Sequence, residues 1–92
     1  MNLLQVNFSD NFKKYYKKRV SPNFSLETKY KERFQLFVAD RQNAILKDHA
    51  LTGKLSGFRA FSITGDVRVV YFPEAEGIVT FVNIGSHNQI YS

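Results

Sequence analysis

Cysteine is absent from the chain, and its absence removes several structures and chemistries. Without thiols there is no disulfide framework, no thiolate nucleophile and no sulfur ligand for a metal. The two histidines, His49 and His87, lack a third ligand at a suitable spacing, so they make a poor zinc set. We therefore expect a protein that uses neither a metal nor a cofactor.

Long apolar runs are missing as well. No stretch of the 92 residues approaches the about 20 apolar positions that a membrane-spanning helix needs. The apolar run in segment 1–12 is too short for a signal peptide and is followed at once by an acidic residue. We expect a single domain over residues 1–92, located in the cytoplasm and without a membrane partner.

Positive charge and aromatic side chains are abundant. Thirteen Lys and Arg residues against eight Asp and Glu give a formal net charge of +5, which favours polyanionic partners such as nucleic acid or the ribosome. Nine Phe and five Tyr supply large side chains, and a domain this small needs such side chains to build a core.

A strand and a basic helix are predicted for the first part of the chain. Alternation over residues Leu3–Phe8 favours a strand, after which Ser9 or Asp10 can cap a helix. This helix has apolar residues every four positions, at Phe12, Tyr16 and Val20. Away from that stripe lie four lysines, Lys13, Lys14, Lys17 and Lys18. They fit either a solvated face or a surface that contacts the ribosome.

A second helix follows after Ser21–Pro22. Ser21 or Ser25 can cap it, and proline is favoured in the first helical position, which supports the earlier start. Its apolar residues form a wide stripe, typical of a helix that lies on a sheet: Leu26, Tyr30, Phe34, Phe37 and Val38.

The second half of the chain reads as a loop followed by three strands. The predicted segments are a loop over 40–57, strands over 58–63, 67–72 and 78–84, a turn over 73–77, and an irregular or helical tail over 85–92. The resulting order, β-α-α-β-β-β, predicts an α+β fold. We expect a twisted antiparallel sheet with two helices packed on one face and the other face partly open.

Two histidines and two strand arginines are the candidates for chemistry. His49 and His87 can exchange protons at cellular pH. Arg68 shares a sheet face with Asp66 and is the stronger candidate to bind phosphate. Arg59 alternates with core residues, so it either binds phosphate or forms a buried structural ion pair.

No glycine-rich phosphate loop and no Ser/His/Asp triad is present, which leaves acid–base groups and cations. That set suits metal-free cleavage of RNA. A base takes the proton of the ribose 2′-hydroxyl, which attacks the adjacent phosphate, while cations stabilise the anionic transition state.

Two segments, LKDHALTGKLSGFRAFSITGDVRVVYF and VNIGSHNQIY, resemble the RelE/ParE toxin superfamily and above all its YafQ branch. The matching elements are Asp48–Gly53, Gly57–Arg59, Asp66, Gly85–His87 and Tyr91. The resemblance implies a ribosome-dependent endoribonuclease that cuts mRNA and is held inactive by a cognate antitoxin protein.

By motif position, the resemblance makes His49, Asp66, His87 and Tyr91 site residues. The two histidines are the candidate acid and base, without an assignment of either role. Asp66 would orient a histidine or raise its basicity, and Tyr91 would stack on a nucleobase or form a hydrogen bond near the phosphate. Lys54, inside the motif-bearing loop, would contact the RNA backbone together with the strand arginines.

The chain departs from the YafQ pattern at two positions. Ser62 stands where a further histidine is common, and Asn83 stands where an arginine is common in the last strand. The first change removes a candidate acid or base and the second removes a phosphate ligand. Arg68 is a candidate to compensate for these losses. Two alternatives therefore stay open: a ParE-like toxin that inhibits DNA gyrase, and a catalytically weakened protein of RelE fold that binds only its antitoxin or RNA.

Overall fold

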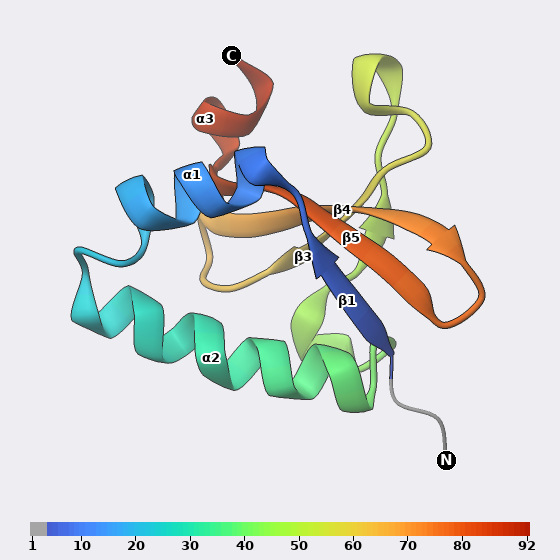
Figure 1. Cartoon of the computed structure of the whole chain (residues 1–92), viewed down its shortest axis with the longest axis horizontal. Helices are drawn as coiled ribbons and strands as arrows, with labels where there is room; N and C mark the ends of the chain where they lie inside the picture. Colours follow the sequence, from blue (N-terminus) through green and yellow to red (C-terminus); the bar gives the residue numbers. More distant parts are fainter. Residues whose placement is uncertain (1–3) are drawn as a thin grey trace.

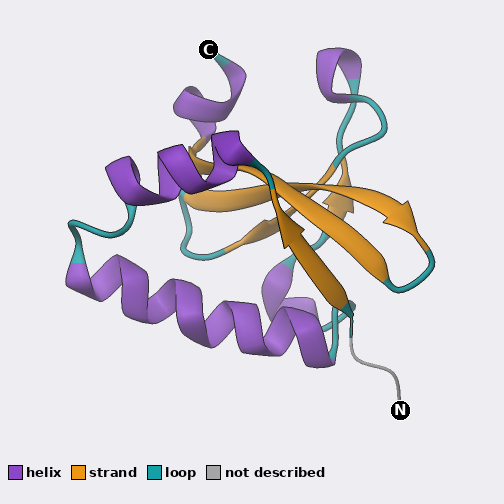
Figure 2. Cartoon of the chain, in the orientation of Figure 1, coloured by secondary structure: helices purple, strands orange, loops and turns teal. Residues whose placement is uncertain are grey.

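The computed structural model describes residues 4–92, and it shows one five-stranded sheet flanked by helices (Figures 1 and 2). The elements in chain order are β1 (Gln5–Phe8), α1 (Asp10–Arg19), α2 (Phe24–Ala39), the 3-10 turn η1 (Ala44–Leu46), β2 (His49–Ala50), the 3-10 turn η2 (Gly53–Leu55), β3 (Arg59–Ser62), β4 (Val67–Ala75), β5 (Ile78–Ser86) and α3 (His87–Tyr91). The predicted α+β class and the order of the long elements are confirmed. Leu3, the predicted first residue of the first strand, lies outside the described residues.

The sheet is mixed rather than antiparallel throughout. Its strand order is β1-β5-β4-β3-β2, and β1 runs parallel to β5, with Val6 opposite Val79 and Phe8 opposite Phe81. The other neighbouring pairs are antiparallel. The expectation of a wholly antiparallel sheet was wrong at β1. Hairpin turns indicate the direction of adjacent strands, but β1 reaches its partner across most of the chain, with no turn between them to indicate direction.

Capping residues set where the two long helices begin. The Ser9 hydroxyl accepts a hydrogen bond from the Phe12 amide at 3.1 Å, as predicted for α1. At α2 the cap is Asn23, whose Oδ1 accepts from the Leu26 amide at 3.0 Å, so the prediction of Ser21 or Ser25 was wrong. Pro22 therefore precedes the cap instead of occupying the first helical turn.

Helices α1 and α2 cover one face of the sheet, as predicted (Figure 1). Phe12 of α1 packs edge-on against Phe81 at 5.4 Å between ring centroids, and Phe37 of α2 stacks on Phe61 at 4.2 Å. Phe37, Phe61 and Phe81 are fully buried. Each such side chain contributes about 1.5–3 kcal/mol through burial, so this aromatic layer is the main core.

The opposite face carries a smaller cluster of buried side chains, Leu51, Ala60, Val70 and Ile90. Ile90 belongs to α3, which begins with a capping box in which Ser86 and Gln89 exchange hydrogen bonds of 3.2 and 2.8 Å. A short helix therefore covers part of the face that was expected to be open.

The β4–β5 hairpin is longer than predicted. β4 continues through Pro73 to Ala75 by means of a register shift, so the turn narrows to Glu76–Gly77, and Gly77 has φ of +77°. The prediction of a turn over residues 73–77 was therefore too wide. Within residues 4–92, no helix is both long enough and apolar enough to cross a membrane.

Candidate active site

Asp48 fixes the loop that carries His49. Its side chain is only 7% exposed, and the Tyr71 hydroxyl lies 2.8 and 2.7 Å from its two oxygens. Arg59 donates from Nε to the same carboxylate at 3.2 Å, and Arg41 lies at 3.9 Å. A carboxylate with so many partners holds the loop to β3 and β4.

The pKa values of the groups around Asp48 follow from this arrangement. Burial, reinforced by the hydrogen bond to Asp48, raises the pKa of Tyr71, so its hydroxyl remains a donor at cellular pH. Burial lowers the pKa of Arg59, but its hydrogen bond to Tyr71 and the charge of Asp48 outweigh burial and raise it. Arg59 thus forms the structural ion pair left open by the sequence, with a side chain that is 35% exposed rather than buried.

His49 is exposed, and its ring is oriented by the backbone. Nδ1 lies 2.9 Å from the carbonyl oxygen of Lys47, a residue in the left-handed conformation with φ of +51°. A carbonyl oxygen only accepts hydrogen bonds, so in neutral His49 the proton sits on Nδ1. Nε2 then carries the lone pair and is available to accept a proton.

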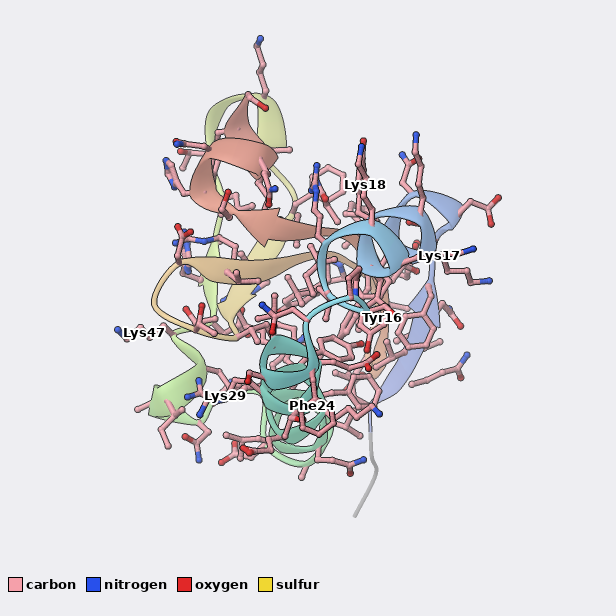
Figure 3. The ribbon with its side chains drawn as sticks, turned by 90° about the vertical axis from the view of Figure 1, so that its left-hand side faces the viewer. Tyr16, Lys17, Lys18, Phe24, Lys29 and Lys47 are labelled. Carbon is pink, nitrogen blue, oxygen red and sulfur yellow. The ribbon has the colours of Figure 1, made fainter. Side chains whose placement is uncertain are left out.

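A cationic hollow of about 510 Å³ adjoins His49. Four Lys and Arg side chains and no carboxylate are among the described residues that line it, which are Lys29, Arg33, Ile45, Lys47, His49, Ser62, Thr64, Gly65 and Arg68. Figure 3 shows Lys29 and Lys47 on the same side of the molecule. Four positive charges around a small volume favour a bound anion.

Arg68 supplies the buried part of that charge. It lies opposite Ser62 across the β3–β4 ladder, so both side chains belong to one face of the sheet. Its Nε is buried and has no hydrogen-bond partner among the described residues. A buried guanidinium donor without a partner is costly in the free protein, and an anion in the hollow would satisfy it.

Three cations of the hollow were missed by the sequence analysis. Lys29 and Arg33 lie four residues apart on α2, and Arg33 donates to the carbonyl oxygens of Ile45 at 3.3 Å and Ser62 at 3.5 Å. Lys47 precedes the motif by one position. The four-residue spacing was a usable signal for Lys29 and Arg33, because it places both on one face of a helix.

His87 does not line this hollow. It is exposed at the start of α3, and its ring packs on Tyr91 with centroids 4.6 Å apart. Tyr91 and Lys54 share a smaller hollow of about 190 Å³. The structure therefore groups His49 with Arg68, and His87 with Tyr91.

Both groups border the same face of the sheet. His49 lies opposite Ala60 in the antiparallel ladder, and residues directly opposite share a face. Ala60 packs in the cluster that contains Ile90 of α3, the helix that begins at His87.

Asp66 lies in a neighbouring hollow of about 530 Å³, not in the hollow of His49. It is exposed, and its backbone amide donates to the Thr64 hydroxyl at 3.3 Å. Within the described chain its carboxylate makes no hydrogen bond to either histidine, so the proposed orienting role stays a prediction.

A family model described as "Bacterial toxin of type II toxin-antitoxin system, YafQ" matches residues 4–92. The chain belongs to the YafQ family of bacterial toxins. Membership in this family implies an endoribonuclease toxin of a type II toxin–antitoxin system. No curated protein sequence matches the chain.

Solved structures similar to this YafQ-family chain confirm the fold. YafQ from E. coli strain BL21(DE3) has a TM-score of 0.80 and 20% identity, over 97% of this chain and 99% of that one. A metal-bound toxin from Helicobacter pylori has a TM-score of 0.73 and 29% identity, over 96% and 99%. The E. coli DinJ–YafQ toxin–antitoxin complex contains a match with a TM-score of 0.78 and 21% identity, over 98% and 99%.

The two departures from the YafQ pattern differ in their structural setting. Ser62 lines the hollow of His49, so that departure removes an imidazole from the candidate site. At Asn83 a residue of another element supplies a cation, because Arg19 of α1 donates to Asn83 Oδ1 at 3.3 Å and to the Ile84 carbonyl at 2.9 Å. Arg19 therefore places a guanidinium beside Asn83.

The basic face of α1 is solvated in this YafQ-family chain. Its four lysines, Lys13, Lys14, Lys17 and Lys18, are all exposed, and Figure 3 shows Lys17 and Lys18 at the surface. Nothing in the protein pairs with their charge by a salt bridge within residues 4–92. Both interpretations, a solvated face and a ribosome contact, are compatible with this exposure.

Proposed function

We propose that the chain cuts mRNA on the ribosome by attack of a ribose 2′-hydroxyl on the adjacent phosphate. One observation carries the proposal: His49 offers a free Nε2 at the edge of a hollow where the buried Nε of Arg68 lacks a partner. A proton acceptor beside an unfilled anion site is what this reaction requires.

In the proposed reaction, the scissile phosphate lies in the hollow against Arg68. Nε2 of His49 takes the proton of the 2′-hydroxyl, whose oxygen forms a bond to phosphorus. The bond from phosphorus to the 5′-oxygen breaks, and that oxygen leaves with a proton. The products are a 2′,3′-cyclic phosphate and a 5′-hydroxyl. All charges are provided by side chains, so the proposed reaction needs no metal ion.

We assign the departing proton to His87 and base stacking to Tyr91. Their support is the shared sheet face and the 4.6 Å packing of the two rings. Since His87 does not line the hollow of the free protein, this part of the proposal requires that RNA binding bring His87 to the departing 5′-oxygen of the phosphate held there.

A cognate antitoxin is the proposed protein partner. The support is family membership together with the structure of the E. coli YafQ relative in complex with DinJ. An acidic or amphipathic antitoxin segment would suit a chain with a net charge of +5.

The test is a translating extract that contains a reporter mRNA, with cleavage sites mapped from 5′ ends. The wild type is expected to cut within the translated region, and only when ribosomes translate. His49→Gln and Arg68→Gln should each lower cleavage by about a hundredfold or more, the usual contribution of a proton-transfer group or a transition-state cation. His87→Gln tests the assignment of the acid.

Lys31→Gln is the matched control for charge. Lys31 is an exposed α2 cation outside the hollow, so its loss should leave cleavage unchanged. Wild-type cleavage by the Arg68 variant would contradict the proposal. Absence of cleavage combined with inhibition of gyrase supercoiling would instead favour the ParE-like alternative.

A further inference from the structure

Three surface hollows adjoin one another along the N-terminal half of α2. The hollow of His49 shares Lys29 and Thr64 with the hollow of Asp66. The hollow of Asp66 shares Leu26 and Val67 with a third. Together they form a groove, which we call the α2 groove, from His49 to the end of α1.

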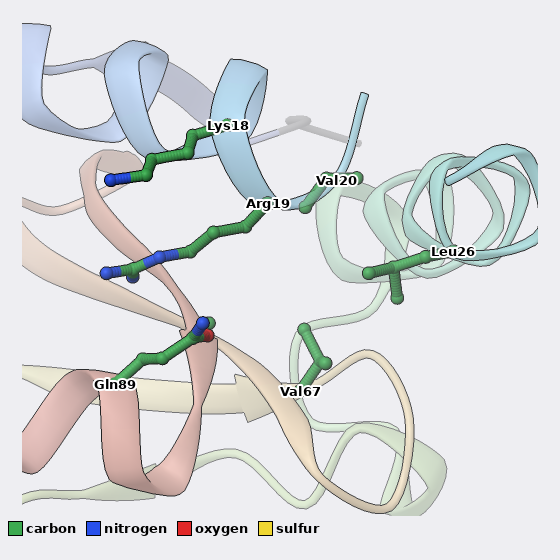
Figure 4. A pocket seen from close by; sticks show the side chains of 7 residues that line it. Lys18, Arg19, Val20, Leu26, Val67 and Gln89 are labelled. Atoms are coloured by element: carbon green, nitrogen blue, oxygen red, sulfur yellow. The ribbon is translucent and has the colours of Figure 1, made fainter. Parts of the chain in front are cut away.

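The third hollow, of about 320 Å³, closes the far end of the α2 groove between α1, α2 and α3 (Figure 4). Its lining residues are Lys18, Arg19, Val20, Leu26, Val67, Gly85 and Gln89. Figure 4 shows the Lys18 and Arg19 side chains extending alongside each other, with Leu26 and Val67 at the opposite side.

Arg19 is held in place at this end of the groove. Its guanidinium lies 4.0 Å from the centroid of the Tyr15 ring and donates to the Ile84 carbonyl at 2.9 Å. A cation fixed by its own protein contacts loses little conformational entropy when it binds an anion. The far end is thus a second preorganised positive site.

Between its cationic ends the groove combines apolar and small polar side chains, with one carboxylate among the described residues that line it. Leu26 and Val67 line the middle, and Asp66 is the acidic residue there. Phe24, at the start of α2, stands in the chain between Asn23 and Ser25, which line this segment, and 83% of its surface is exposed. An exposed aromatic ring offers a stacking surface for a nucleobase.

The length of the groove suits a short piece of single-stranded RNA. Leu26, which the middle and far hollows share, and Arg33, which lines the hollow of His49, are seven residues apart on α2, or about 10 Å at 1.5 Å per residue. At about 3.4 Å per nucleotide this corresponds to roughly three stacked nucleotides.

We propose that the α2 groove binds the single-stranded RNA that flanks the scissile phosphate. Backbone phosphates lie at the two cationic ends, one base lies over Leu26 and Val67, and Phe24 stacks on an adjacent base. Asp66 accepts a hydrogen bond from the amino group of the central base, which explains a carboxylate in a groove for a polyanion. This inference rests on the proposed function, because it extends the same substrate beyond the His49 hollow.

Charge favours RNA over an acidic protein segment in this groove. RNA can alternate a phosphate at each cationic end with a neutral base at Asp66 in the middle. An acidic segment would place carboxylates near Asp66, where like charges repel.

The experiment is an NMR titration of the ¹⁵N-labelled protein with two RNAs, a dinucleotide and a hexanucleotide, both fully 2′-O-methylated so that no nucleophile remains. Both should shift amides around Arg68, and only the hexanucleotide should also shift those around Val67 and Lys18. Lys18→Gln should weaken hexanucleotide binding about threefold and lower the magnitude of its salt slope by about 0.7, the value per phosphate contact on single strands. Phe24→Ala should weaken it about fivefold or more.

Lys31→Gln is the matched control, since Lys31 is an exposed cation on α2 outside the groove. It should leave binding of both RNAs unchanged, and the dinucleotide should be insensitive to Lys18→Gln and Phe24→Ala. The exposed positions of Lys18 and Phe24 preserve the fold, which thermal melts check.

Each other outcome is distinguishable. If Lys18→Gln and Phe24→Ala bind the hexanucleotide as tightly as the wild type, while Arg68→Gln still abolishes binding and cleavage, the groove inference is overturned and the proposed function stands. If Lys18→Gln and Phe24→Ala weaken only an acidic peptide, the groove holds a polypeptide and the inference is wrong. If Arg68→Gln affects neither RNA binding nor cleavage, both the inference and the proposed function fail.

Discussion

Replacing Tyr71 with phenylalanine should destabilise the protein and displace the catalytic loop at the same time. The substitution removes one hydroxyl and leaves the ring packed on Phe37 and Phe61. Asp48 then loses its two shortest contacts, of 2.7 and 2.8 Å, although it remains largely buried.

The magnitude follows from the partners that remain. A hydrogen bond to a charged acceptor contributes about 1.5–3 kcal/mol. Arg59 and Arg41 stay beside Asp48, but each is more than a third exposed, so each offsets less than about 1 kcal/mol. We expect a loss of about 2 kcal/mol in the free energy of unfolding, which lowers Tm by roughly 8–16 °C for a domain of this size.

Cleavage should fall as well, because Asp48 immediately precedes His49. A displaced proton acceptor lowers the rate by about tenfold or more even when the protein is folded. The assays are urea unfolding monitored by circular dichroism, and mRNA cleavage at a temperature where the variant is fully folded.

Tyr30→Phe is the control for loss of the hydroxyl from a buried tyrosine. Tyr30 is 7% exposed, and its hydroxyl makes no hydrogen bond within residues 4–92. Its removal should change stability by less than about 0.5 kcal/mol and leave cleavage unchanged. Equal losses in the two variants, or a Tyr71→Phe protein with wild-type stability and activity, would refute the assigned role of the Asp48 cluster.

Three further predictions concern stability and activity. Burial raises the pKa of Tyr30 and Tyr71 above their ordinary 10.0, so the folded state retains protons that the unfolded chain releases. These groups should therefore leave the free energy of unfolding unchanged below about pH 10 and lower it above pH 10. The fall should be shallower in Tyr71→Phe, and urea unfolding from pH 8 to 11 would measure it. Phe37→Ala should cost about 3–5 kcal/mol in the same assay, because it opens a cavity between α2 and Phe61. Ser62→His should raise the rate of mRNA cleavage, since it adds a proton-transfer group to the hollow of His49, and an unchanged rate would show that position 62 is not used.

The sequence predicted the elements well where periodicity and hairpin turns decide them. The four-residue repeat of Phe12, Tyr16 and Val20 placed α1 against the sheet, and the Thr64–Gly65 turn joined two neighbouring strands. It could not predict the parallel pairing of β1 with β5, because strand direction across such a distance depends on the packing of the intervening helices.

The candidate site was predicted in its chemistry more than in its grouping. The motif brought out His49 and strand alternation brought out Arg68, and the two do share a hollow. It did not indicate that His87 would instead pack on Tyr91, because α3 turns away from the end of β5. Nor did it identify Arg19, which lies beside Asn83 although the two residues are 64 positions apart in the chain.

The most direct test of the central claim replaces a single oxygen in the substrate. A reporter mRNA would carry one 2′-deoxyribose immediately 5′ of a mapped cleavage site, with the same substitution one nucleotide away as its control, in a ribosome programmed with that message. If the 2′-hydroxyl attacks the phosphate held beside Arg68 and His49, the first message stays intact and the second is cut. Equal cleavage of both messages would contradict the mechanism.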